Sequence, residues 1–263
     1  FLFQSVYLFR DKKIYQRYGA NLQVIEDYTS TDLEDMSVAK NYNKWIIDLC
    51  QPYIGSTILE VGAGTGNFTE SLLEHTASDI FAIEPMKTPA EVWKDKHLGW
   101  SEAYRQRSKL LRTFVHDLPS DMSVDTIIYN NVLEHIQHDI EEIKQAQQHL
   151  RPGGHFVIYS PALPALMSNF DRSIGHHHRY TKASIIEKVQ KTGLEVSFFR
   201  YVDLPGVLLW YVKFVLLKSQ HLGTGSVRFF DSFIVPLQRR IEALFNIPVG
   251  KNVLCIAQKT SLK

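Results

Sequence analysis

Residues 59–69 read Leu-Glu-Val-Gly-Ala-Gly-Thr-Gly-Asn-Phe-Thr, and this stretch decides the fold. A short apolar run, 57–61, leads directly into three glycines at alternate positions within 62–66, and a helical pattern follows over 67–75. Glycine adopts positive φ at little cost and lets the backbone approach a ligand closely. The first turn of a helix also presents N–H groups that have no partner within the helix. The stretch therefore predicts a strand–turn–helix unit with a ligand at the turn.

An acidic residue, Glu84, follows the next apolar run along the chain, 79–83. In a parallel sheet its carboxylate lies at the same edge as the glycine turn, where it can accept both hydroxyls of a ribose. The glycine spacing is G-x-G-x-G, whereas dinucleotide sites use G-x-G-x-x-G. This difference disfavours a nicotinamide-dependent oxidoreductase, which stays open as an alternative. Another alternative is a tight turn without a ligand, with Glu84 as a solvated charge.

Strand and helix patterns alternate along most of the chain, which is typical of a parallel sheet with helices on both faces. Strands are expected at 57–61, 79–83, 112–115, 124–129, 155–159, 194–202 and 252–259, and helices at 35–51, 67–75, 136–150 and 181–192. The turn Arg151-Pro152-Gly153-Gly154 is expected to stop the third of these helices and to start the fifth strand. We predict an α/β fold, a Rossmann-like doubly wound sheet of about seven strands, mostly parallel.

Several short motifs in this order resemble those of the class I S-adenosylmethionine-dependent methyltransferases, especially a subgroup that includes ubiquinone-biosynthesis-type enzymes. The similarity covers most of the chain, at 41–45 (Asn-Tyr-Asn-Lys-Trp), the glycine stretch, 116–118 (His-Asp-Leu), 130–135 (Asn-Asn-Val-Leu-Glu-His) and 151–154. The resemblance implies S-adenosylmethionine as cofactor, with the glycine stretch at its methionine part, Glu84 at its ribose and Asp117 at its adenine. The residues implied for cofactor binding are Glu60, Gly62, Ala63, Gly64, Gly66, Asn67, Glu84, Pro85, Asp117, Leu118, Asn130 and Asn131.

The loop after the fifth predicted strand is expected to frame the acceptor site, because open α/β sheets bind ligands beyond the carboxyl ends of their strands. It reads Asp171-Arg172-Ser173-Ile174-Gly175-His176-His177-His178-Arg179-Tyr180. The subgroup's pattern is Asp, a spacer and Gly-His-x-Arg-Arg-Tyr, and His178 stands where that pattern has its first Arg. On this interpretation His176, His178 and Tyr180 lie at the mouth of the pocket. His176 is the first candidate for a general base, and His135 is a second.

Two other interpretations of this loop stay open. Asp171 and Arg179 could form an ion pair that pins the loop, with Tyr180 packed beside it. A metal site would need two or three imidazoles that converge with a carboxylate such as Asp171. Adjacent histidines usually point in different directions, and no pair in the loop has the i, i+4 spacing of helical ligands, so we predict no metal.

The chain is expected to have a helical N-terminal lead-in (1–56), a methyltransferase core (57–203 and 251–263) and an apolar insertion (204–250). Three roles are open for the insertion. It could be an ordinary helical cap, a lid that seals an apolar acceptor from water, or a surface that meets a membrane or a lipid-linked acceptor. Its longest apolar run, 206–217, contains Lys213 and is too short to span a bilayer.

The composition is that of an ordinary globular protein, with 29 basic and 28 acidic residues and a formal net charge of +1. Without a basic block, we predict no nucleic-acid partner and a small-molecule acceptor. Cys50 and Cys255 form no zinc pattern and the first residues lack a secretory-signal layout, so a cytoplasmic location is expected. The predicted function is methyl transfer from S-adenosylmethionine to an O or N atom of a small, part-apolar metabolite. A non-catalytic, cofactor-binding partner subunit is the alternative.

Overall fold

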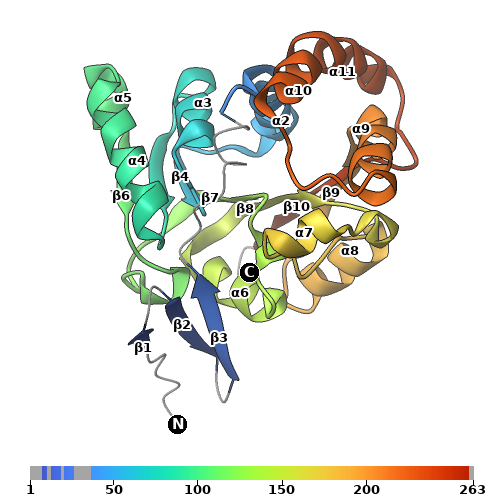
Figure 1. Ribbon diagram of the computed structural model, residues 1–263. Coiled ribbons are helices and arrows are strands. Elements are labelled where there is room, and N and C mark those ends of the chain that lie inside the picture. The colour runs from blue at the N-terminus through green and yellow to red at the C-terminus, as the bar shows by residue number, and fades with distance from the viewer. Residues whose placement is uncertain (1–7, 11–12, 19–20, 27–36, 261–263) are drawn as a thin grey trace.

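We analysed a computed structural model of the chain, which describes residues 8–10, 13–18, 21–26 and 37–260 (Figure 1). Its centre is a seven-stranded sheet in the order β6-β5-β4-β7-β8-β10-β9. The strands are β4 (Thr57–Val61), β5 (Asp79–Ile83), β6 (Ser108–Leu111), β7 (Val124–Asn130), β8 (Leu150–Pro161), β9 (Glu195–Val202) and β10 (Asn252–Gln258). β4 to β8 pair in parallel, whereas β10 is antiparallel to both of its neighbours. The predicted fold class is confirmed.

Helices cover both faces of this sheet, so its strands are apolar on both sides. On one face α2 (Lys40–Cys50), α3 (Asn67–His75) and α4 (Lys87–Gly99) enclose a core with strand residues such as Ile58 and Ile128. On the other face α6 (Asp139–Ala146) and α8 (Lys182–Gln190) pack over residues such as Ile127 and Phe156. Two shorter helices, α5 (Glu102–Gln106) and α7 (Asn169–Ser173), lie in the connections.

The N-terminal segment differs from the helical lead-in that we predicted for 1–56. β1 (Leu8–Arg10), β2 (Lys13–Tyr18) and β3 (Asn21–Glu26) form a separate antiparallel sheet, and only α2 matches the helical expectation. The physical reason lies in the period, because Asn-Leu-Gln-Val within β3 alternates polar and apolar residues as a strand does. The predicted start of the first helix, Asp35, lies outside the described residues.

Two boundaries in the core also differ from those predicted. The third strand was predicted at 112–115, but β6 lies at Ser108–Leu111, where it pairs with Ile80–Ile83 of β5. The apolar run around it is longer than one strand, so only this pairing selects the register. The predicted turn at 151–154 belongs instead to β8, because Gly153 N donates to Lys259 O (2.7 Å) and extends the ladder with the end of β10.

The insertion before β10 is helical, as predicted, and we call residues 204–250 the cap. It contains α9 (Leu204–Trp210), α10 (Thr224–Phe229) and α11 (Val235–Leu244), with π-helical turns at Tyr211–Leu216 and Phe230–Ile234. The cap lies beside one end of the sheet, above α7 and α8 in Figure 1. Its two ends meet, because Lys251 N donates to Asp203 O (2.9 Å). No helix among the described residues has the length and hydrophobicity needed to cross a bilayer.

Candidate functional site

The glycine turn after β4 has a backbone that only glycine can adopt at two positions. Gly62 has φ +73°, and a Cβ added there would lie 2.4 Å from Val132 Cγ2. Gly66 has φ +83°, and its Cβ would lie 2.6 Å from Trp93 Cδ1. Both clashes involve side chains packed around the turn, so substitution would displace the loop. The turn therefore brings bare backbone to the carboxyl edge of the sheet.

Glu84 lies directly against this turn, as its place after β5 predicted. Its side chain is buried, and its Oε2 accepts a hydrogen bond from Gly64 N (2.8 Å) while Oε1 accepts one from Met86 N (2.9 Å). Gly62 N and Ala63 N donate to the carbonyl of Ile83, which ties the turn to the end of β5. The glycine backbone and the predicted ribose acid thus meet in one site.

A second buried carboxylate, Glu60, lies at the end of β4. It accepts a hydrogen bond from Thr69 Oγ1 (2.6 Å) in α3. Burial raises the pKa of Glu60 to about 8, and the negative charge of Glu84 adds to this shift. The Glu84 carboxylate beside a bare backbone turn favours a ligand that carries positive charge, and a bound cation would in turn favour the ionised form of Glu60. This chemistry fits S-adenosylmethionine, which carries a sulfonium and an ammonium group.

The other residues predicted to bind the cofactor surround the same edge. Asp117 lies in a short 3₁₀ turn after β6 with its side chain 46% exposed, and Leu118 is buried beside it. Asn130 ends β7, and Asn131 N donates to Tyr159 O (2.8 Å) of β8. Pro85 follows Glu84, and Asn67 begins α3. All of the predicted set therefore lies at the carboxyl ends of β4, β5, β6 and β7.

The 161–180 loop is pinned by the ion pair that was one of the sequence interpretations. Asp171 is fully buried and its Oδ1 accepts hydrogen bonds from Arg179 Nη2 (2.8 Å) and Nε (3.0 Å). His176 Nδ1 lies 2.9 Å from the same oxygen. Burial alone would raise the pKa of Asp171, but the hydrogen bond with His176 and the charge of Arg179 hold it below its ordinary value. The loop is built around this carboxylate.

Two of the predicted catalytic residues do not lie where we expected. Tyr180 is 1% exposed and its hydroxyl donates to Asp139 Oδ2 (2.9 Å), so it cannot stand at the mouth of a pocket. Burial, with the charge of Asp139, raises its pKa. His178 Nε2 lies 3.2 Å from Gln137 O, so its ring packs against the connection that leads into α6. Both side chains hold the loop to neighbouring elements because their partners lie outside the loop.

His176 lies in a cluster with His135 and Glu134. From the sequence, His176 and His135 were separate candidates for a base, and nothing predicted that they would meet. One potential ligand atom from each residue lies within 4.8 Å of the others, and the two imidazole rings meet edge to face at 4.6 Å. Glu134 is fully buried; its Oε2 accepts from Ser160 Oγ (2.9 Å), and among the described residues its Oε1 has no hydrogen-bond partner. These three donors could hold a metal ion, although we predicted none.

The electrostatics of this cluster separate its two histidines. Burial, reinforced by the neighbouring charges of His176 and His177, lowers the pKa of His135 to about 3, so its imidazole stays neutral. Burial also raises the pKa of Glu134, against the opposing effect of His176. Neutral His135 is therefore a poor proton acceptor at neutral pH. His176 remains the better candidate for a base, with Asp171 to orient it.

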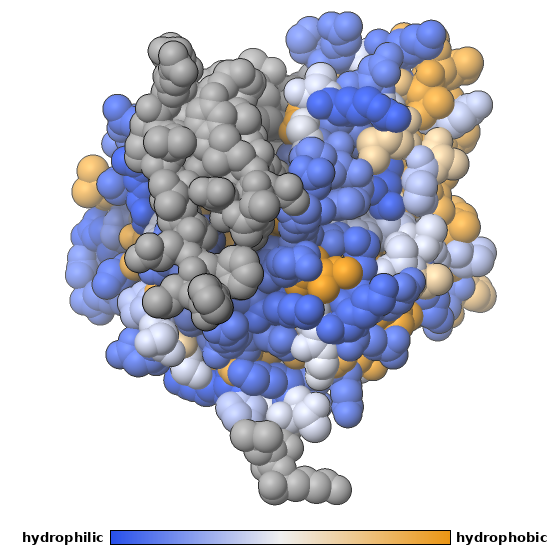
Figure 2. All heavy atoms as spheres, turned by 90° about the horizontal axis from the view of Figure 1, so that it is seen from below, coloured by the Kyte–Doolittle hydropathy of each residue, from blue (hydrophilic) through white to orange (hydrophobic). Residues whose placement is uncertain are grey.

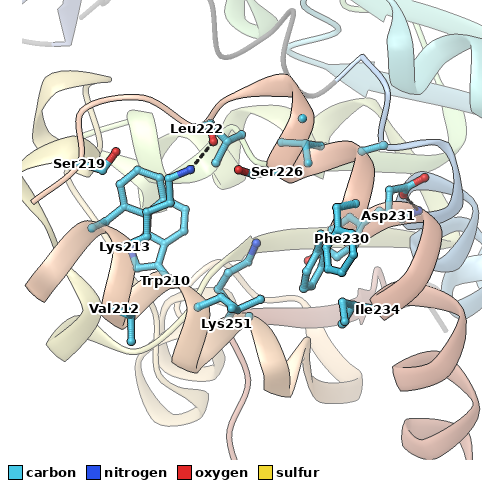
Figure 3. A pocket seen from close by; sticks show the side chains of 18 of the residues that line it. Trp210, Val212, Lys213, Ser219, Leu222, Ser226, Phe230, Asp231, Ile234 and Lys251 are labelled. Carbon is cyan, nitrogen blue, oxygen red and sulfur yellow. Dashed lines mark hydrogen bonds between the residues drawn. The ribbon is translucent and has the colours of Figure 1, made fainter. Parts of the chain in front are cut away.

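A cavity of about 860 Å³ lies between the cap and the carboxyl edge of the sheet (Figure 3). Figure 3 shows Trp210 and Lys213 on one side of it, Phe230 and Ile234 on the other, and Lys251 between them. Most of its wall is apolar. A lid over an apolar acceptor was one of the three roles open for the insertion, but the sequence contained no local signal for a cavity, because its walls come from segments far apart.

One polar corner of the cavity is formed by a buried network. Tyr42 of α2 lines the cavity, and its hydroxyl lies 2.7 Å from Tyr159 Oη and donates to Asp203 Oδ2 (3.1 Å). Asn252 Nδ2 donates to Tyr42 Oη (2.7 Å). Lys251 Nζ lies 3.2 Å from Asp203 Oδ2, in an ion pair. The cavity thus joins apolar walls to a hydrogen-bonding corner at the ends of β8 and β10.

The cap also packs on the 161–180 loop, so the cavity and the His176 cluster belong to one region. Phe170 stacks on Phe214 with ring centroids 4.5 Å apart. Arg179 Cζ lies 4.7 Å above the ring of Trp210, whose Nε1 donates to Leu166 O (3.2 Å). The side chain that pairs with Asp171 therefore also supports a wall of the cavity.

The known proteins with similar sequences are named for the transfer of methyl or carboxymethyl groups. A family described as "Methyltransferase domain" matches residues 25–197. The tRNA U34 carboxymethyltransferase of Idiomarina loihiensis is 26% identical over 104 residues, which are 40% of this chain and 32% of that protein. The chain spans about a third of the length of the curated relatives it matches.

Solved structures with similar folds have low sequence identity. A chain from the complex between the Haloferax volcanii Trm112 methyltransferase activator and a methyltransferase superposes with a TM-score of 0.58 at 14% identity, covering 89% of this chain and 97% of that one. Geranyl diphosphate C-methyltransferase from Streptomyces coelicolor superposes with a TM-score of 0.56 at 16% identity, covering 82% of this chain and 77% of that one. The family match spans well over half of the present sequence. The chain therefore belongs to the methyltransferase-domain family.

Proposed function

We propose that this enzyme methylates an O or N atom of a small acceptor whose apolar part occupies the cavity beneath the cap. The cavity carries this proposal, because its apolar walls and hydrogen-bonding corner suit a molecule that is apolar at one end and polar at the other. It lies at the carboxyl edge of the sheet, as does the glycine turn. An acceptor held there would present its polar end toward the donor.

When bound, S-adenosylmethionine supplies a methyl group that is already activated by its sulfonium. The protein must then hold the acceptor atom, the methyl carbon and the sulfur in line, and such positioning can contribute about 7–11 kcal/mol. In our proposal the glycine turn and Glu84 hold the donor, while the cap and the 161–180 loop hold the acceptor. Closure of the cap over the apolar part of the acceptor also excludes water.

His176 is the proposed base for an acceptor that loses a proton. Its Nδ1 lies 2.9 Å from Asp171 Oδ1, so the carboxylate favours the tautomer with hydrogen on Nδ1 and leaves Nε2 able to accept a proton. A positioned base contributes roughly 10²–10⁴-fold when the acceptor is a hydroxyl. We expect His176→Asn to lower the turnover number by a factor in this range and to leave the dissociation constant for S-adenosylhomocysteine unchanged.

The proposal is tested by filling the cavity. Tritium-labelled S-adenosylmethionine is incubated with the enzyme and, in separate reactions, with an organic-solvent extract or an aqueous extract of cells that naturally contain the protein. We expect label in the organic-soluble products, and Leu222→Trp, which adds bulk to the cavity wall, should abolish it. The matched control is Leu98→Trp on α4, where the side chain is 72% exposed. Both variants should bind S-adenosylhomocysteine in calorimetry. Undiminished labelling by Leu222→Trp would refute an acceptor in the cavity.

RNA is a second candidate acceptor, because the curated relatives are named as tRNA carboxymethyltransferases. Against it, the chain has a net charge of +1 and no concentrated basic block. Adding unmodified tRNA to the same labelling assay separates the two candidates. Label in the tRNA fraction would favour RNA, and label in neither fraction would favour a partner subunit without activity of its own.

A further inference from the structure

The cap exposes two rows of large apolar side chains, which we call the cap surface. Members of each row follow one another at intervals of four residues, with a last interval of three in the second row. The first row runs along α9 and its π-turn, and comprises Leu204 (41% exposed), Leu208 (65%), Val212 (38%) and Leu216 (62%). The second follows α10 to α11, and comprises Phe229 (60%), Phe233 (66%), Leu237 (58%), Ile241 (49%) and Leu244 (76%).

The π-turns explain why residues four apart stay on one side. An α-helix has 3.6 residues per turn, so a strict spacing of four drifts around its axis. A π-turn closes i→i+5 hydrogen bonds and so takes an extra residue into the turn, which corrects the drift. Each row contains one such turn, at Tyr211–Leu216 and Phe230–Ile234. The cap thus presents continuous apolar rows.

This surface is unusual for the molecule as a whole. Figure 2 shows hydrophobic spheres gathered along the right-hand edge, the side on which Figure 1 places the cap, while most of the face in view is hydrophilic. Outside the cap, the large apolar side chains exposed among the described residues are only Val92 and Leu98. Contiguous exposed apolar surface of this kind marks a docking site for a partner or a membrane.

The charges around the rows indicate the chemistry of that partner. The structure describes all of 204–250, and its exposed charged side chains are the cations Lys218, Arg228 and Arg240. Its two acidic residues are buried and hydrogen-bonded to backbone N–H groups. Asp231 accepts a hydrogen bond from Tyr42 N (2.8 Å), and Glu242 accepts one from Leu204 N (3.0 Å). The cap therefore presents apolar rows with positive charge only, which complements an anionic surface.

The cavity opens onto these rows. Val212 and Phe229 belong to the cap surface and also line the cavity, and Leu209 and Leu217 line it while being 51% and 70% exposed. An apolar molecule that enters the cavity between these side chains passes along apolar surface rather than through water. An aqueous opening for a water-soluble acceptor would not need this rim.

We propose that the cap surface docks on a lipid membrane with anionic headgroups. The apolar rows enter the interfacial layer, and the three cations lie among the headgroups. A second copy of this chain is a poorer occupant, because a symmetric contact would bring the same cations together. Docking requires neither methyl donor nor acceptor, so it goes beyond the proposed methyl transfer. It also places the mouth of the cavity against the bilayer.

The test is co-sedimentation of the full chain with vesicles. One set is phosphatidylcholine, and the other is an equimolar mixture of phosphatidylcholine and phosphatidylglycerol. We expect binding to the mixed vesicles that weakens as salt is added, with much weaker binding to phosphatidylcholine alone. The double variant Phe233→Asp/Leu237→Asp should lower partitioning to mixed vesicles by more than about tenfold. Leu98→Asp, at a leucine outside the cap that is even more exposed (72%), is the control and should change it by less than about twofold.

Charge reversal provides the second arm. Arg228→Glu/Arg240→Glu should remove the preference for mixed over neutral vesicles. All variants should bind S-adenosylhomocysteine, which shows that they are folded. Docking is overturned if the wild-type chain stays in the supernatant with mixed vesicles, or if the Phe233/Leu237 variant sediments like wild type. It is also overturned if light scattering shows a wild-type dimer that this variant abolishes. Methyl transfer to soluble acceptors without vesicle binding would leave the proposed function intact.

Discussion

Gly62 is the residue at which backbone strain and close packing coincide most clearly. A valine there would need a φ near +73° and would place its Cβ 2.4 Å from Val132 Cγ2. We expect Gly62→Val to cost roughly 2–4 kcal/mol of folding free energy and to abolish detectable binding of S-adenosylhomocysteine in calorimetry. Gly99→Val is the control, since nothing lies within 4 Å of its Cβ position. Retained affinity in the Gly62 variant would contradict the proposed role of the turn.

Glu60 predicts a pH dependence of stability in the free protein. Its folded pKa is about 8 against an ordinary 4.5, so between these values the folded state holds a proton that the unfolded state has released. Stability must then fall as pH rises through this window. We expect Glu60→Gln to raise the free energy of unfolding at pH 8.5 by roughly 1–3 kcal/mol relative to wild type, with little difference at pH 4.5. Urea denaturation at the two pH values measures this, and the midpoint of the variant should lie higher at pH 8.5. Equal midpoint shifts at both pH values would contradict the assignment.

The positions of single residues also show which contacts could be predicted from local sequence patterns and which could not. The approach of Glu84 to the glycine turn was predictable, because each follows a parallel strand and such ends share one edge. The prediction for Tyr180 was wrong because its family motif says nothing of Asp139, which lies 41 positions earlier and accepts a hydrogen bond from the Tyr180 hydroxyl. Burial of a motif residue depends on such partners, and they belong to other elements.

At the level of elements, the N-terminus of α2 is hydrogen-bonded by the side chain of Asp231, which belongs to the 204–250 segment. Ala39 precedes α2 without a side-chain hydrogen bond, and Asp231 instead accepts from Asn41 N (3.1 Å) and Tyr42 N (2.8 Å). A carboxylate at a helix N-terminus also interacts favourably with the helix dipole. This contact fastens α10 and α11 to the core.

We therefore expect Asp231→Ala to lower the free energy of unfolding by about 1.5–3 kcal/mol, because two backbone donors, one of them buried, lose a charged acceptor. Hydrogen exchange should accelerate in α2 and along 224–244. Ser232→Ala, at the adjacent exposed position, is the control and should behave as wild type. Unchanged exchange in both segments of the Asp231 variant would show that the contact does not hold the cap in place.

For the whole molecule, the cap should be removable as a unit. Lys251 N lies 2.9 Å from Asp203 O, so a short Gly-Ser linker can replace 204–250 without stretching the sheet. We expect this deletion variant to unfold cooperatively and to bind S-adenosylhomocysteine, yet to lose methyl transfer to organic-soluble acceptors. Its stability should fall because Val227 and Val235 leave the core cluster. A folded variant without affinity for S-adenosylhomocysteine would show instead that the cap builds part of the donor site.

By itself, the sequence determined the parallel core, the glycine turn and the family resemblance. These follow from strand and helix periods and from backbone demands that act within a few residues. Only the tertiary structure decided the cavity, the Glu134–His135–His176 cluster, the capping of α2 by Asp231 and the exposed rows of the cap. Each depends on which distant segments meet and on which side chains remain uncovered when they do, and no local pattern encodes either outcome.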